Sequence, residues 1–209
     1  MTERSQDTNA ALSNRLEILI EELPEDHLSV KDLIERCGEE GLLLLSALLT
    51  LVFLIPVSLP GVSTAFGAVI LLVGISRLRK GPLWLPKRVE KKKVTVEKLR
   101  PALERGLKWV RRLEKVSRSH RLPILADSRI AGLINNLAFV IAALLLMAPF
   151  GFVPLSNTLP GIALLFYAMG LAQRDGVAVL LGHLAHIFTL AYFGILIGGG
   201  GVAIKNFLT

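Results

Sequence analysis

Two histidines in an apolar segment near the end of the chain are the residues whose chemistry is easiest to define. His183 and His186 stand three positions apart, so a helix would carry both side chains on one face. Imidazoles in that arrangement can share a metal ion or pass a proton. No carboxylate or cysteine stands near them in the segment, which favours a hydrogen bond to a neighbouring helix instead. We therefore expect interhelical hydrogen bonding and no metal site.

A second set of polar residues interrupts two uncharged segments, 41–76 and 130–173. Proline at an interruption removes a backbone donor, so freed carbonyls and nearby hydroxyls or amides could bind a cation or a small solute. The same residue types favour ordinary turns, and turn capping at a membrane surface is the alternative. The candidates for solute or ion binding are Ser58, Pro60, Ser63, Thr64, Ser156, Asn157, Thr158 and Pro160, with Pro56 and Pro154 beside them.

Further polar residues stand inside or at the ends of the apolar segments. The adjacent asparagines should have at least one side chain facing protein, because a lipid-facing pair is unfavourable. The adjacent glutamates could pair with Arg77 or Arg79, and the Arg-Asp pair before Gly176 predicts a boundary turn with a local ion pair. These secondary candidates are Asn135, Asn136, Glu39, Glu40, Arg77, Arg174 and Asp175.

The apolar content indicates what must position these residues. Of the 209 residues 52% are hydrophobic, and no charged residue occurs in 41–76, 130–173 or 176–204. Soluble domains are usually about 45–50% apolar, and three such segments are typical of chains that cross a bilayer, where a central charge costs roughly 2.5–3.5 kcal/mol. The sequence therefore predicts an all-α integral membrane protein.

Charge is separated along the chain. Residues 1–40 carry eleven acidic and four basic side chains, and residues 77–121 carry seventeen basic side chains and four glutamates. The basic block lies between apolar segments, so the positive-inside rule explains it better than nucleic-acid binding does, and no recognition motif accompanies it. The acidic start lacks the apolar core of a signal peptide. We expect a multi-pass membrane protein with a cytoplasmic N-terminus.

Periodicity divides the chain into four parts. Residues 1–40 predict a cytoplasmic acidic hairpin of two helices, over 11–22 and from Ser29 to Gly38. Residues 41–76 predict a first broken membrane hairpin, formed by two short spans or by a re-entrant loop. Residues 77–121 predict a basic loop and an amphipathic helix over 96–118 that lies against anionic lipid. Residues 122–209 predict a second broken hairpin, interrupted from 149 to 161, and a final span over 177–197 that trails into a flexible Gly198–Gly201 end.

The two broken hairpins resemble each other. Each has Leu-Pro-Gly at its interruption, and a shift of 96 residues superposes Gly74 on Gly170, although the prolines then fall out of step. Paired interruptions in two halves are a sequence indication of a transporter site near the membrane midplane. Two ordinary surface turns are the other interpretation.

Short motifs in order along the chain resemble the ExoD family of bacterial exopolysaccharide-synthesis proteins. They are Leu-Ser-Asn-Arg-Leu-Glu at 12–17, Glu-Glu-Leu-Pro-Glu-Asp at 21–26, Leu-Pro-Gly-Val-Ser-Thr at 59–64, Trp-Leu-Pro at 84–86 and Arg-Asp-Gly at 174–176. The resemblance covers nearly the whole chain. It implies an inner-membrane protein linked to exopolysaccharide production, and it supplies no catalytic residues.

Two functions remain open from the sequence. The first is a transporter or channel for an ion or a small charged solute such as an amino acid. The second is a non-transporting accessory of a polysaccharide synthesis or export complex. We expect no enzyme and no cofactor, because no catalytic constellation occurs and Cys37 is the only cysteine. The short apolar lengths also predict a homodimer, since oligomerisation is one response to hydrophobic mismatch.

Overall fold

The computed structural model describes residues 12–24, 27–54, 62–81, 83, 93–113, 121–148 and 153–208. Its described part is helical apart from two three-residue strands, which confirms the predicted helical class. The elements are α1 (Leu12–Glu21), β1 (His27–Ser29), α2 (Val30–Leu51), the 3-10 helix η2 (Val52–Leu54), α3 (Val62–Arg79), β2 (Lys93–Thr95), α5 (Val96–Leu113), α6 (Pro123–Asp127), α7 (Arg129–Leu146), α8 (Thr158–Gln173) and α9 (Gly176–Leu208).

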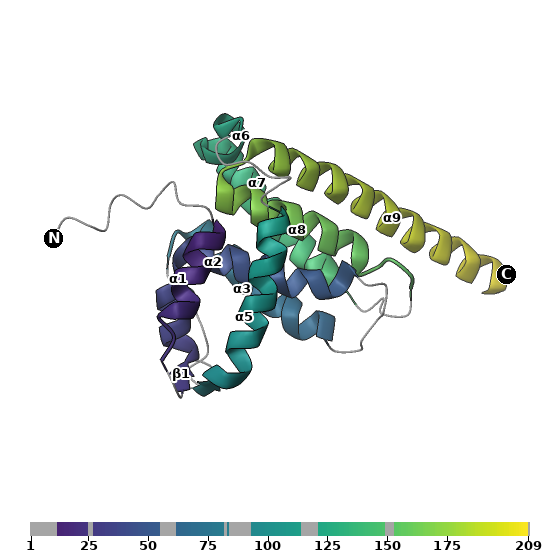
Figure 1. Ribbon diagram of the computed structural model, residues 1–209. Coiled ribbons are helices and arrows are strands. Elements are labelled where there is room, and N and C mark those ends of the chain that lie inside the picture. Colours follow the sequence, from purple (N-terminus) through teal and green to yellow (C-terminus); the bar gives the residue numbers. More distant parts are fainter. Residues whose placement is uncertain are drawn as a thin grey trace.

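Helices α2, α3, α7 and α8 form a closed bundle at the centre of the protein (Figure 1). Helix α2 packs against α3 and α8, and α7 packs against the same two helices. Glycines permit the closest approaches, because a Cβ on Gly74 of α3 would lie 2.9 Å from a ring carbon of Phe139 on α7. The fully buried side chains of Leu43, Ile70, Phe139 and Leu164 show that all four helices contribute to one core.

Both interruptions lie at the same end of this bundle. Gly161 at the start of α8 faces Phe53 and Thr50, which directly precede the first interruption. Gly67 near the start of α3 faces Met147, which directly precedes the second. The two hairpins, α2–α3 and α7–α8, therefore run in the same direction, and their charged ends meet at the opposite end of the bundle.

Helix α9 packs along α8 and then extends beyond the bundle to the C-terminus (Figure 1). Helices α7 and α9 are long and apolar enough to cross a membrane, over Arg129–Leu146 and Gly176–Gly199. Their outward faces stay apolar, with Leu133 and Ile141 exposed on α7 and Ile187 and Phe188 exposed on α9. Contiguous exposed apolar surface of this kind is typical of a membrane or protein contact.

A peripheral layer is built from α1, α5 and the two strands. Strands β1 and β2 form an antiparallel ladder in which Leu28 pairs with Val94. The sequence did not predict this ladder. The predicted hairpin needs correction, because α1 packs chiefly against α5 rather than against α2. The apolar side of α5 is likewise covered by protein: Leu103 and Val110 are buried, and Gly106 lies against Leu48 of α2.

Three predicted boundaries also change. The helix that begins after the Ser29 N-cap continues beyond Gly38 as part of α2, with a non-helical residue at the bend. Thr158 and Pro160 lie in the first turn of α8, where a proline needs no backbone donor, so the second interruption is shorter than predicted. Helix α9 continues through Gly198–Gly201, because a helix satisfies every backbone polar group within an apolar segment.

Candidate functional site

A hydrogen-bonded polar cluster connects α7, α8 and α9 inside the apolar part of the protein. The Tyr167 hydroxyl lies 2.9 Å from Nδ1 of His183 and 3.4 Å from Nδ1 of His186. Nε2 of His183 lies 2.8 Å from Oδ1 of Asn135, whose Nδ2 donates to the Leu125 carbonyl at 2.8 Å. The cluster is therefore a continuous chain of polar groups from α6 to His186.

Local sequence explains why these side chains meet. The buried stripe of α9 contains Val179, Gly182, His186 and Thr189 at helical spacing, so it faces α8 while the other sides remain apolar. The missing side chain at Gly182 admits the Tyr167 ring, which lies edge-on to both imidazoles. Tyr167 has no exposed surface and Asn135 is 2% exposed, so both polar groups depend on partners inside the protein.

The cluster confirms part of the sequence interpretation and adds one residue to it. The histidines do form interhelical hydrogen bonds, and Asn135 does face protein, as predicted. Tyr167 was missed, although a phenol inside an otherwise apolar run was the available signal. Its significance depends on the packing of α8 against α9, which spacing along the chain does not reveal. Within the described residues, no group of three or more His, Cys, Asp and Glu could hold a metal ion.

A second polar site holds the charged ends of the bundle together. Nε of Arg77 donates to Oδ1 of Asn136 at 3.0 Å, and its Nη1 lies 3.6 Å from Oε2 of Glu39. Of the partners that the sequence left open for the two glutamates, Arg77 pairs with Glu39, and the side chain of Asn136 faces protein as one of the two asparagines was expected to. These contacts join α2, α3 and α7, so Arg77 is an interhelical connector.

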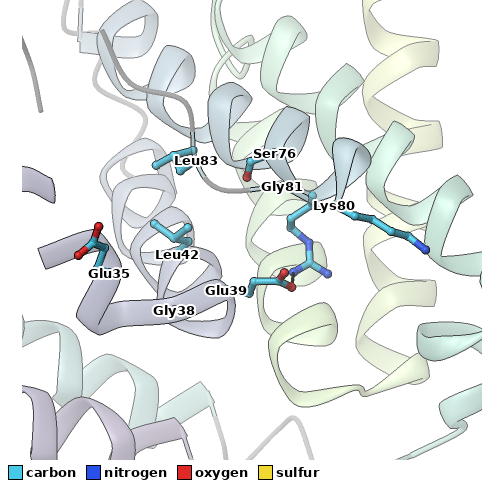
Figure 2. Close-up of a pocket in the computed structure, with 9 residues that line it drawn as sticks. Glu35, Gly38, Glu39, Leu42, Ser76, Lys80, Gly81 and Leu83 are labelled. Carbon is cyan, nitrogen blue, oxygen red and sulfur yellow. Dashed lines mark ion pairs between the residues drawn. The ribbon is translucent and has the colours of Figure 1, made fainter. Parts of the chain in front are cut away.

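A cavity of about 350 Å³ opens beside Arg77. Figure 2 shows the bend of α2 at Gly38 along one side of the cavity, Leu42 among the lining residues, and the Lys80 side chain pointing away from the others. Its lining combines acidic, basic and apolar groups: Glu35, Gly38, Glu39, Leu42, Ser76, Arg77, Lys80, Gly81 and Leu83. This mixture of lining side chains does not indicate one class of ligand.

The candidates at the interruptions are only partly brought together. Ser58, Pro60 and Pro56 lie outside the described residues. Ser63 is buried and Thr64 is exposed at the start of α3, beside α7. Ser156, Asn157 and Pro160 are buried at the start of α8, beside η2. Oδ1 of Asn157 has no hydrogen-bond partner among the described residues.

The predicted boundary turn is present between α8 and α9. Arg174 adopts a left-handed conformation and ends α8, and the Asp175 backbone N–H donates to the Gly170 carbonyl at 2.8 Å. Oδ1 of Asp175 accepts from the Val177 N–H at 2.9 Å, so this buried carboxylate caps α9. Both residues thus have structural roles in a tight helical turn. The remaining secondary candidate, Glu40, is half-buried on α2.

Apolar outward faces around an interhelical Tyr–His–Asn cluster are typical of a membrane-associated helical protein. Comparison with known proteins gives its family. The family described as "Exopolysaccharide synthesis, ExoD" matches residues 12–195, and the chain belongs to that family, as its motifs predicted.

Two relatives illustrate the breadth of the family. The chain is 42% identical over 190 residues to Protein ExoD of Rhizobium meliloti (strain 1021), covering 91% of this chain and 79% of the relative. It is 30% identical over 170 residues to an uncharacterized protein of Synechocystis sp., covering 77% and 76%. No solved structure matches the chain.

Proposed function

We propose that this ExoD family protein moves an ion or a small charged solute across a bacterial inner membrane in association with exopolysaccharide synthesis. The observation that carries the proposal is the hydrogen-bonded chain Asn135–His183–Tyr167–His186, which is buried except for the partly exposed His183 and lies between helices with apolar outer faces. Polar and ionisable groups inside membrane segments are unfavourable unless paired, and they commonly mark ion or substrate pathways. The cation or amino-acid classes expected from the sequence remain the proposed substrates.

Depth along the helices supports the cluster, rather than the interruptions, as the centre of the site. His186 lies ten residues after Gly176, roughly 15 Å along the helix axis. That distance is about half of a 30 Å hydrocarbon core. Helices α7 and α8, of 18 and 16 residues, have lengths of roughly 27 and 24 Å. The interruption between them is therefore better explained as a turn near the far surface.

The orientation follows from charge at the other end of the bundle. Arg77 and Arg79 lie in the last turn of α3, Lys80 follows it directly, and the basic α5 comes later in the chain. The positive-inside rule places this end in the cytoplasm, together with the N-terminus. The exposed basic side of α5 would then be available to anionic lipid while its apolar side packs on protein. We retain a homodimer, which the exposed apolar side of α9 would support.

An origin by duplication is part of the proposal. Helices α3 and α8 begin at Val62 and Thr158, which are separated by the same 96 residues that superpose Gly74 on Gly170. The packing of α2 on α8 also parallels that of α7 on α3. The glycines themselves have different neighbours, since Gly74 faces α7 and Gly170 faces Val179 of α9. Two parallel repeats explain the helix arrangement better than inverted ones.

Flux measurements on the purified protein in liposomes test the proposal. Vesicles are assayed for uptake of Na⁺, K⁺ and a mixture of radiolabelled amino acids, with protein-free vesicles as the baseline. We expect uptake of at least one probe by the wild type and a loss of that uptake in His183→Ala. Leu184→Ala is the matched control, because the neighbouring side chain is exposed on the apolar side of α9. Uptake no greater than the baseline for every probe overturns the proposal.

The accessory function is favoured by one separate observation. The layer of α1 and α5 is joined by an exposed ion pair between Glu17 and Arg111 at 2.8 Å, and it presents charged side chains to solvent. Such a surface suits a protein partner from a polysaccharide synthesis or export complex. Affinity purification from native membranes tests this alternative. Loss of a co-purifying synthase or export component on deletion of residues 1–24, which leaves β1 and α2 in place, with liposome uptake absent, would favour the accessory function.

A further inference from the structure

The direction of every hydrogen bond in the polar cluster follows from one fixed acceptor. The Leu125 carbonyl can only accept, so it must face Nδ2 of Asn135, and Oδ1 of Asn135 must face His183. Nε2 of His183 therefore carries a hydrogen and donates to Oδ1. In a neutral imidazole the other ring nitrogen is then an acceptor. Nδ1 of His183 thus accepts the hydrogen of the Tyr167 hydroxyl.

The same reasoning extends to His186. Tyr167 donates its single hydrogen to His183, so its oxygen can only accept from Nδ1–H of His186. Nε2 of His186 then carries a lone pair. This atom is buried and has no hydrogen-bond partner among the described residues. A buried acceptor without a partner is unfavourable, so it needs an explanation.

We propose that this chain is a proton-binding site, and that one proton enters at Nε2 of His186. A new N–H bond forms there while the Nδ1–H bond of His186 breaks and its proton passes to the Tyr167 oxygen. The original Tyr167 proton passes to Nδ1 of His183. Tyr167 and His186 end neutral, and the positive charge resides on the His183 imidazolium, with both of its N–H groups hydrogen-bonded to neutral oxygens.

The chain stores a proton rather than conducting it onward. An amide oxygen is a poor proton carrier, and the hydrogens of Asn135 are directed at the Leu125 carbonyl. Of the described titratable groups around His186, Tyr167 lies on α8 and His183 on α9 itself, whereas α7 contributes the neutral Asn135. A single lone pair suits a proton better than a metal ion, which needs several ligands. The inference rests on the proposed function only in coupling this proton to solute movement.

Nitrogen-15 NMR of labelled histidines in nanodiscs tests the site without any transport. The chain has four histidines, so His27→Gln and His120→Gln leave only the pair of interest. At high pH we expect the Nε2–H tautomer at His183 and the Nδ1–H tautomer at His186. On acidification the two rings should change together with the uptake of one proton. Tyr167→Phe should uncouple the two titrations, and Tyr192→Phe, whose hydroxyl donates to the Pro154 carbonyl, should not.

Liposome uptake measurements distinguish failure of this inference from failure of the proposed function. Coupled protonation together with solute uptake that responds to a pH gradient supports both ideas. Coupled protonation with no uptake of any probe supports the proton site and overturns transport. Uptake that ignores the pH gradient overturns the coupling. The Nε2–H tautomer at His186, or independent titration of the two rings in the wild type, overturns the proton site.

Discussion

Gly182 on α9 lies directly against the ring of Tyr167 on α8. A Cβ atom at position 182 would lie 2.8 Å from Cδ1 and 2.9 Å from Cε1 of that ring. The ring is fully buried, so it has little room to move away. The close approach of α8 and α9, and hence the hydrogen bonds of Tyr167 to both histidines, depends on the absence of a side chain at this position.

Replacement of Gly182 by alanine should therefore separate the two helices. We expect Gly182→Ala to lower the free energy of unfolding by about 1–3 kcal/mol, the usual range for an overpacked core. Unfolding of the purified protein by SDS in mixed micelles would measure the change. Gly194→Ala is the control on the same helix, since nothing lies within 4 Å of its Cβ position. Equal effects of the two substitutions would contradict the packing argument.

The bend in α2 leads to a second prediction. Gly38 has φ 61° and ψ −171°, a region of backbone space that is almost restricted to glycine. Gly38→Ala should lower the free energy of unfolding by about 1–3 kcal/mol through backbone strain alone, because its Cβ would meet nothing within 4 Å. Thermal unfolding followed by circular dichroism would measure this loss.

Gly132→Ala is the matched control for the bend. Gly132 also has open space around its Cβ position, but it lies in regular helix on α7. Alanine there should be neutral or stabilise by up to about 1 kcal/mol through helix propensity. A loss at Gly132 as large as that at Gly38 would show that strain at the bend is not the cause.

The sequence predicted what depends on local pattern. Uncharged length predicted α7, α8 and α9, and the Ser29–Asp32 spacing predicted the start of α2. Each of these features follows from solvent preference or from hydrogen bonds within one turn.

Most long-range pairing was not accessible from the sequence; the Glu39–Arg77 pair is the exception, because these charges flank the same uncharged segment. Glu17 and Arg111 are 94 residues apart, and the ladder of β1 with β2 joins segments separated by a whole hairpin. Tyr167 was overlooked for the same reason, because its chemistry arises only from its position opposite two histidines on α9. The prolines at the interruptions drew attention instead, since helix breaks are visible in sequence and helix neighbours are not.

Arg77 should contribute through its planar guanidinium rather than through charge alone. Arg77→Lys keeps the charge but loses the Nε donor to Asn136. We expect a loss of about 1–2 kcal/mol in the free energy of unfolding. Arg79→Lys, an exposed position on the same helix, should change it by less than about 0.5 kcal/mol.

A double-mutant cycle would assign the loss to the hydrogen bond. Arg77→Lys and Asn136→Ala together should destabilise by less than the sum of the two single substitutions, because both remove the same contact. Glu39→Gln should have the smaller effect, since the Glu39 side chain is 78% exposed. Additive effects of the Arg77 and Asn136 substitutions would rule out the pairing.

Cysteine labelling should reveal the arrangement of the bundle in the membrane. Cys37 is the only cysteine, so Cys37→Ser gives a background for single cysteines at Arg79, Ile141 and Leu155. Arg79 lies at the charged end of the bundle and Leu155 at the opposite end, and both side chains are exposed.

A membrane-impermeant maleimide should label Arg79→Cys only in inside-out vesicles and Leu155→Cys only in right-side-out vesicles. Ile141→Cys, exposed midway along α7, should resist labelling from both sides because lipid covers it. Rapid labelling of all three cysteines from one side would show that water surrounds these helices, and the membrane-crossing arrangement would then have to be abandoned.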